Sequence, residues 1–144
     1  MRNDTIRIGV VGAGNKTRET HIPQLKAIEG VEVVSLANRT KESGLQVAEK
    51  LGIPTVYDNW LEVVEDVDND AICIGTWPYM HCAVTLAALE NNKHVLCEAR
   101  MAMNGVEART MLEAARQRPH LITQVVPSVH FAKSYTIIKE LISD

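Results

Sequence analysis

A Gly-x-Gly turn near the N-terminus has the clearest chemical meaning in this chain. The apolar run Ile6–Val11 ends at Gly12-Ala13-Gly14, and Asn15-Lys16-Thr17 follows as a polar segment that can form a helix. Gly12 permits a tight turn, and Gly14 has no Cβ to keep backbone N–H groups away from a pyrophosphate. The positive end of the next helix would face those phosphates. These six residues therefore predict a dinucleotide-binding turn, although Thr17 stands where a third glycine or alanine is usual.

The second chemical signal is the end of the apolar run Val31–Ala37. An acidic residue there would hold the ribose 2′-OH of NAD, but the sequence continues as Asn38-Arg39-Thr40, without a carboxylate. Arg39 could instead pair with a 2′-phosphate, and its alternative is a solvated arginine beside a helix cap formed by Thr40. We therefore expect Asn38 and Arg39 to contact the cofactor, and NADP to be favoured over NAD.

A third group follows the apolar run Ala71–Gly75. Ligands of open α/β sheets bind beyond the carboxyl ends of the strands, so Thr76, Trp77 and His81 should face the same crevice as the glycine turn. Trp77 could lie against a nicotinamide or a ribose, or it could cover the core. His81 opens a helix, where a hydrogen-bonded structural role competes with a role at the cofactor.

Alternating strand and helix patterns must position these residues. Apolar runs typical of buried parallel strands occur at Ile6–Val11, Val31–Ala37, Ala71–Gly75, His94–Cys97 and Leu121–Val126. Helical patterns lie between them at Arg18–Ile28, Lys41–Leu51, Met80–Asn91 and Val106–Arg116. Thr55–Tyr57 predicts a minor strand, and Asn59–Val64 a short capped helix. The fold class is therefore α/β: a doubly wound, mostly parallel Rossmann sheet in three αβα layers, forming one domain over residues 1–144.

A further helix is expected over Ser134–Ile142, where Ile137, Ile138, Leu141 and Ile142 form an apolar face. Such a face needs a surface to pack on. Docking against the sheet is one explanation, and contact with a domain that is absent from these residues is the other.

The composition limits the class of partner. With 144 residues, 46% of them hydrophobic, and a net charge of −3, the chain has no basic stripe for nucleic acid. Without a signal-peptide pattern or an apolar run of membrane length, we expect a cytoplasmic protein with no membrane partner.

The three cysteines are Cys73, Cys82 and Cys97, and they have no metal-ligand spacing. They predict reduced, structural thiols and no metal site.

The segment Asn92–Arg100, taken with Gly12–Gly14, Thr76–His81 and Leu86–Leu89, resembles the Gfo/Idh/MocA oxidoreductases. The resemblance runs from Arg7 to about Leu141. It implies the family's N-terminal NAD(P)-binding Rossmann domain, followed in the whole enzyme by a domain that binds a sugar- or polyol-like substrate. Members usually associate through that second domain, so a homo-oligomer is implied for the parent protein. The implied reaction is hydride transfer between nicotinamide and a hydroxyl carbon.

One departure from the family pattern bears on catalysis. The family commonly has Glu-Lys-Pro where this chain has Glu98-Ala99-Arg100, and the family's lysine helps to transfer protons. Ala99 cannot hold a proton, so the catalytic residues stay unassigned. Glu98 matches the family's glutamate and is expected near the ribose or nicotinamide; a carboxylate bonded to backbone N–H groups is the alternative. These residues alone are expected to bind cofactor weakly and to turn nothing over.

Two other classes of function remain open from the sequence. The first is a non-catalytic dinucleotide-binding module, used for sensing or structure, which Ala99 favours. The second is an S-adenosylmethionine-dependent methyltransferase, which shares the glycine turn. Asn38 and Arg39 argue against the second class, because it would need an acidic residue at the end of the second strand.

Overall fold

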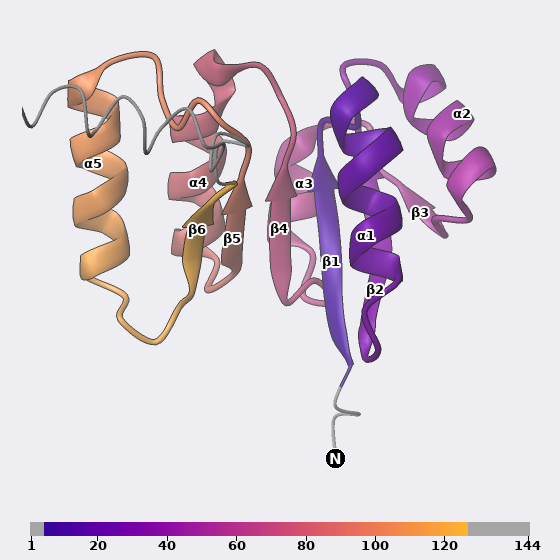
Figure 1. Cartoon of the computed structure of the whole chain (residues 1–144), viewed down its shortest axis with the longest axis horizontal. Coiled ribbons are helices and arrows are strands. Elements are labelled where there is room, and N and C mark those ends of the chain that lie inside the picture. The colour runs from indigo at the N-terminus through magenta and orange to yellow at the C-terminus, as the bar shows by residue number, and fades with distance from the viewer. Residues whose placement is uncertain (1–4, 127–144) are drawn as a thin grey trace, which may run out of the picture.

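Six parallel strands form the centre of the structure in the order β3-β2-β1-β4-β5-β6 (Figure 1). The computed structural model describes residues 5–126. The strands are β1 (Ile6–Val11), β2 (Val31–Ala37), β3 (Thr55–Val56), β4 (Ala71–Ile74), β5 (His94–Cys97) and β6 (Thr123–Val125). This strand order confirms the predicted doubly wound Rossmann fold and shows that the sheet is entirely parallel.

The helices cover both faces of the sheet. They are the π-helical turn η1 (Thr17–His21), α1 (Ile22–Lys26), α2 (Lys41–Leu51), α3 (Trp60–Glu65), α4 (Pro78–Glu90) and α5 (Gly105–Arg116). Figure 1 shows α1 in front of the sheet, and α3 and α4 behind it. Two separate apolar clusters match these layers: α1 and α2 contribute to one, and α3, α4 and α5 to the other. The predicted three-layer architecture is therefore confirmed.

Neighbouring residues of the central strands supply opposite clusters. On β1, Val10 belongs to the cluster under α1 and α2, whereas Val11 belongs to the cluster under α3 and α4. On β4, Cys73 faces the first cluster while Ile72 and Ile74 face the second. Because both faces are covered there, the buried parts of these strands, residues 8–11 in β1 and 72–74 in β4, do not alternate with polar residues.

Local capping explains why several helices have the predicted bounds. Thr40 Oγ1 accepts a hydrogen bond from the Ser43 N–H at the start of α2, and Gly52 ends that helix with φ +63°. The Asn59 side chain accepts from the first N–H groups of α3. These contacts involve residues close in sequence, which is why the sequence pattern located them.

The helix after the glycine turn differs from its prediction, Arg18–Ile28. Helical structure begins at residue 15 and ends at Lys26, with a π-helical turn between residues 17 and 21. The backbone N–H of Arg18 already donates to the Gly14 carbonyl at 2.8 Å, so the helix starts directly after the glycine turn. Ile28, the last residue of the predicted range, is 54% exposed because the helix stops before it.

Other boundaries shift by two residues or fewer. α4 begins at Pro78, two residues before the predicted start, because proline fits the first turn of a helix. β6 spans Thr123–Val125, inside the predicted range Leu121–Val126, because only these residues pair with β5.

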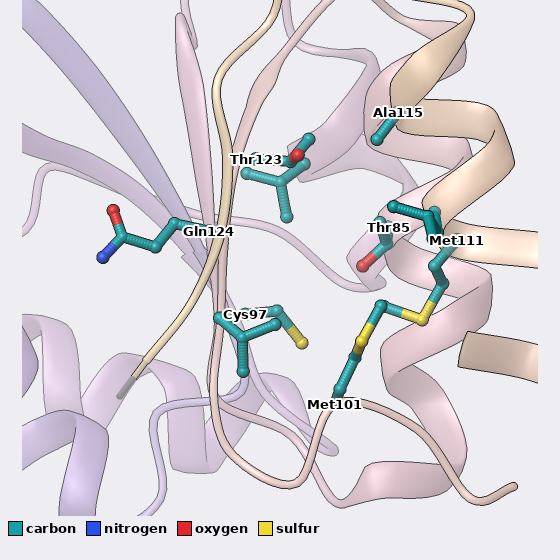
Figure 2. A pocket seen from close by; sticks show the side chains of 10 residues that line it. Thr85, Cys97, Met101, Met111, Ala115, Thr123 and Gln124 are labelled. Carbon is teal, nitrogen blue, oxygen red and sulfur yellow. The ribbon is translucent and has the colours of Figure 1, made fainter. Parts of the chain in front are cut away.

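An apolar cavity of about 180 Å³ lies between α5 and the β5–β6 side of the sheet. Figure 2 shows Met101 and Met111 beside it, with Gln124 pointing the other way across the sheet. Thr85 is 4% exposed and lines this cavity; its Oγ1 lies beside the Cys97 thiol but forms no hydrogen bond of ordinary geometry within residues 5–126. The cavity lies away from the glycine turn, so we treat it as a packing defect.

The segment Ser134–Ile142, for which a helix was expected, lies outside the described residues. Within residues 5–126, every helix is too short or too polar to span a lipid bilayer.

Candidate functional site

The carboxyl ends of β1, β2, β4 and β5 bring the expected site residues to one edge of the sheet. β1 pairs with β2 on one side and with β4 on the other, and the chain changes face between these pairs. Ligands bind at such a topological switch point in open α/β sheets. The glycine turn leaves β1 at this point, between the loop after β2 and the loop after β4.

Gly12 closes the turn against its neighbours. It has φ +84°, and its N–H donates to the Ala37 carbonyl at 2.9 Å. A Cβ at this position would lie 2.8 Å from the backbone nitrogen of Thr76. A side chain here is therefore excluded both by the backbone conformation and by the packing.

Gly14 has the opposite environment. A Cβ placed on it would have no atom within 4 Å, so its surface is open to solvent. Gly14 immediately precedes the helix that begins at residue 15. An open backbone surface at the positive end of a helix fits a phosphate group.

Thr17, the departure from the glycine fingerprint, packs directly against Gly75. Thr17 is 1% exposed, and a Cβ on Gly75 would collide with Thr17 Oγ1 and with the Gly12 carbonyl. The third glycine of the fingerprint normally permits close packing of helix and strand. Here the glycine is Gly75, in the loop after β4, and the side chain that packs against it is Thr17 of the helix. Helix and strand therefore still approach closely, although the glycine lies on the opposite side of the contact.

The loop after β4 carries an unpaired hydroxyl. Thr76 Oγ1 is buried and has no hydrogen-bond partner within residues 5–126. A buried polar atom without a partner is costly unless a ligand or water completes it. Together with the open surface of Gly14, this hydroxyl shows that the residues present fit a polar ligand such as a dinucleotide.

Trp77 does not cover the core. It is 73% exposed where α4 begins, and its neighbour Tyr79 is 63% exposed. The alternative that Trp77 caps the core is therefore wrong. The exposed ring is available to a ligand or to another surface.

Asn38 holds the glycine turn from the side. Its Oδ1 accepts the Ala13 N–H at 2.7 Å, which ties the end of β2 to the turn after β1. Arg39 is exposed, and we find no hydrogen bond or ion pair for it in the described part of the chain. Thr40 caps α2 as the sequence predicted.

Asn15 and Lys16 form the exposed first turn of the helix. Asn15 Oδ1 accepts from Arg18 Nη2 at 2.7 Å, and Lys16 is exposed. Neither side chain is buried by protein, so both stay available at the open side of the turn.

His21 was missed in the sequence, and the structure pairs it with Glu98. Its Nε2 lies 3.1 Å from Glu98 Oε2, and the two side chains are only 10% and 20% exposed. The π-helical turn ends at His21, which is buried at one turn's spacing from Thr17. The four-residue spacing between Thr17 and His21 was the signal available in the sequence, because it places the histidine on the buried side of the helix, next to Ile22. Within the described residues, the Glu98 carboxylate is thus bonded to an imidazole and to no backbone N–H group.

His81 connects two loops of the site. Its ring is fully buried; Nδ1 lies 2.9 Å from the Arg100 carbonyl, and Nε2 lies 2.9 Å from the Thr76 carbonyl. Both partners are carbonyl oxygens, so a neutral ring donates its single N–H to one of them while the other nitrogen lies beside the second. This geometry favours the hydrogen-bonded structural role over contact with a cofactor. Ala99 is exposed beside these loops.

The cysteines lie apart as free thiols. Cys73 and Cys97 are buried on neighbouring strands, and Cys82 is half-buried on α4. Burial raises the pKa of Cys73 to about 12 and that of Cys97 to about 11, so both stay protonated near neutral pH. Within residues 5–126, no three histidine, cysteine or acidic side chains gather as metal ligands.

Fold and site together define a Rossmann domain of the dinucleotide-binding class. The chain belongs to the Gfo/Idh/MocA oxidoreductase family, whose NAD-binding Rossmann fold matches residues 6–125. This match confirms the resemblance carried by the glycine turn and by Asn92–Arg100.

Several named proteins are similar in sequence to this chain. A 1,5-anhydro-D-fructose reductase from Ensifer adhaerens is 40% identical over 111 residues, covering 77% of this chain and 33% of the relative. The human glucose-fructose oxidoreductase domain-containing protein 2 is 31% identical over 137 residues, covering 95% of this chain and 34% of that protein. The chain therefore spans about a third of the length of these relatives.

Solved structures share the fold. A 3-ketoreductase from Actinomadura kijaniata, in complex with NADP and TDP-benzene, matches with a TM-score of 0.81 at 22% identity, covering 96% of this chain and 42% of that one. Scyllo-inositol dehydrogenase from Lactobacillus casei, with bound NAD(H) and scyllo-inositol, matches with a TM-score of 0.79 at 24% identity, covering 96% and 41%. The two neighbours hold different dinucleotides on one architecture.

Proposed function

We propose that this chain is the cofactor-binding domain of an NAD(P)-dependent oxidoreductase that acts on a sugar- or polyol-like hydroxyl carbon. The observation that carries the proposal is the open backbone surface of Gly14 at the head of a helix, at the switch point of the sheet. The unpaired Thr76 hydroxyl at the same edge supports it. Family membership supports the same class of reaction.

In this proposal the chain's own residues bind and orient the cofactor. Backbone N–H groups of residues 14–16 face the pyrophosphate, whereas the Ala13 N–H is donated to Asn38, which braces the turn. The Thr76 hydroxyl donates to or accepts from the ligand. Exposed Trp77 lies at the nicotinamide side. Bound reduced nicotinamide supplies a hydride, and the protein contributes positioning and electrostatics. The His21–Glu98 pair and His81 hold the surrounding loops.

NADP is the cofactor that the proposal favours. No carboxylate occupies residues 38–41, directly after β2, where an acidic residue would repel a 2′-phosphate, and Arg39 is exposed beside Asn38 without an ion pair in the described part of the chain. The family model and the solved neighbours are compatible with either dinucleotide.

A pair of glycine substitutions tests the proposal. Gly14→Ala and Gly105→Ala each add a methyl group in open space, so neither should disturb the fold. Only Gly14→Ala should weaken NADPH and NADH binding, by roughly tenfold or more, which corresponds to about 1.4 kcal/mol. Quenching of tryptophan fluorescence on titration with each dinucleotide gives the affinities. If both variants bind like the parent, or if the parent binds neither dinucleotide, the proposal fails.

Ala99 favours a second candidate, a dinucleotide-binding module without catalysis. An exposed methyl group stands where relatives of this family commonly have a lysine, and a methyl group cannot transfer a proton. In the full-length parent, Ala99→Lys separates the two candidates. A change in turnover, followed by reduced-nicotinamide absorbance with a panel of polyols, supports an enzyme; no turnover before and after the change supports the module.

A further inference from the structure

A recess of about 380 Å³ opens between the helix after the glycine turn and α2. Its lining includes Ala13 and Asn38, the two residues joined by the 2.7 Å hydrogen bond. In dinucleotide-binding units, the adenosine ribose is recognised at the end of the second strand, which is the position of Asn38. The recess therefore begins where a 2′-substituent of that ribose would project.

The charged side chains that line the recess are both cations. Arg18 enters from η1 and Lys50 from the last turn of α2, and no carboxylate lines the space. Arg18 Nη2 already bonds to Asn15 Oδ1, with Glu19 Oε1 at 3.6 Å, whereas its Nε is buried without a partner in the described part of the chain. Lys50 is exposed and forms no ion pair there.

The neutral lining adds polarity. Gln46 presents an amide from α2, and Ser43 lies in the first turn of the same helix. The Ser43 hydroxyl donates to the Thr40 carbonyl, and Asn38 uses its Oδ1 as the acceptor for Ala13, so the side-chain donors left for a ligand are the NH2 groups of Asn38 and Gln46 and the two cationic side chains. A dianion suits this set, because charge-assisted hydrogen bonds to Arg and Lys are the strong ones.

We infer that this recess binds the 2′-phosphate of NADP, through Arg18 and Lys50. The inference rests on the proposed function, since the ribose must first be placed by the glycine turn. It assigns recognition of the 2′-phosphate to Arg18 and Lys50, which line the recess, whereas the sequence alone had indicated Arg39, which does not line it. A 2′-phosphate carries between one and two negative charges near neutral pH, which matches the two cations.

Isothermal titration of the 144-residue chain with 2′,5′-ADP and with 5′-AMP tests the inference, because these ligands differ only in the 2′-phosphate. We expect 2′,5′-ADP to bind at least about tenfold more tightly, as one charge-assisted contact is worth about that factor. Lys50→Gln and Arg18→Gln should each reduce this ratio roughly three- to tenfold. Arg109→Gln, which removes an exposed charge on α5, should leave the ratio unchanged.

A variant with the opposite effect strengthens the test. Glu19→Gln removes the carboxylate that competes for Arg18, and it should raise the ratio. The inference is overturned if neither Lys50→Gln nor Arg18→Gln lowers the ratio, if only Arg39→Gln does, or if inorganic phosphate binds the recess while the two nucleotides bind equally. If neither nucleotide nor dinucleotide binds, the proposed function itself fails, which is a different result from equal binding of both.

Discussion

Thr17 and Gly75 exchange the roles that a dinucleotide-binding turn usually gives to the helix and to its surroundings. Thr17 is buried against the loop after β4, and Gly75 leaves the space that its side chain occupies. The closeness of helix and sheet is therefore preserved without a third glycine in the turn. This contact explains how a sequence that departs from the fingerprint keeps the geometry of the site.

The Thr17–Gly75 contact predicts that a side chain at position 75 destabilises the fold and that removing the Thr17 side chain only partly restores stability. Gly75→Ala should lower the free energy of unfolding by about 1–3 kcal/mol, because the new methyl group overlaps Thr17 and the Gly12 carbonyl. Adding Thr17→Gly should restore only part of the loss, since the carbonyl remains. Urea denaturation of the single and double variants measures this. Gly105→Ala is the control; an equal effect at both glycines would contradict the packing argument.

The His21–Glu98 pair should couple the helix after the glycine turn to the loop after β5. In a double-mutant cycle with His21→Ala and Glu98→Ala, we expect a coupling free energy of about 1 kcal/mol, typical of a partly buried hydrogen bond. Urea denaturation again gives the four values. A parallel cycle with Glu90→Ala, an exposed residue of α4, should show no coupling; similar values in the two cycles would rule out a specific contact.

Thr85→Val should stabilise the protein. The Thr85 hydroxyl is buried beside the apolar cavity, and its polar neighbour is the Cys97 thiol, a weak hydrogen-bonding group that does not meet ordinary hydrogen-bond geometry with it. Valine keeps the shape of the side chain while removing this poorly paired hydroxyl. We expect a gain of about 1 kcal/mol in the free energy of unfolding. Thr110→Val is the matched control, because Thr110 Oγ1 donates to the Val106 carbonyl and is exposed. A loss of stability in Thr85→Val would mean that the hydroxyl is satisfied in solution.

The buried thiols should make the fold sensitive to alkaline pH. Burial raises the pKa of Cys73 from 9.0 to about 12 in the folded chain, so the native state holds a proton that the unfolded state releases above pH 9. The stability contribution is fully present below pH 9 and falls as the pH rises toward 12. The slope reaches at most about 1.4 kcal/mol per pH unit for one thiol. Cys73→Ala should flatten the fall measured by urea denaturation between pH 8 and 10.5, and identical slopes would contradict this account.

Local signals in the sequence were sufficient for the order of elements and for several boundaries. Thr40, Asn59 and Gly52 lie next to the helices that they start or stop, so their effect depends on neighbouring residues only. Mostly apolar runs such as Ile6–Val11, interrupted only by Arg7, indicated strands buried on both faces, as the two clusters confirm. The glycine turn and Asn92–Arg100 were enough to identify the family.

The tertiary structure alone decided which residues meet at the site. Asn38 reaches the Ala13 N–H from 25 positions away, and His21 reaches Glu98 from 77 positions away. Composition and periodicity describe each segment by itself, whereas these contacts depend on how the strands order in the sheet and on a π-helical turn that repositions His21. Thus the sequence by itself determined that the chain forms a Rossmann domain with a glycine turn. Only packing between distant segments decided that Gly75 accommodates Thr17 and that Arg18 and Lys50 border one recess.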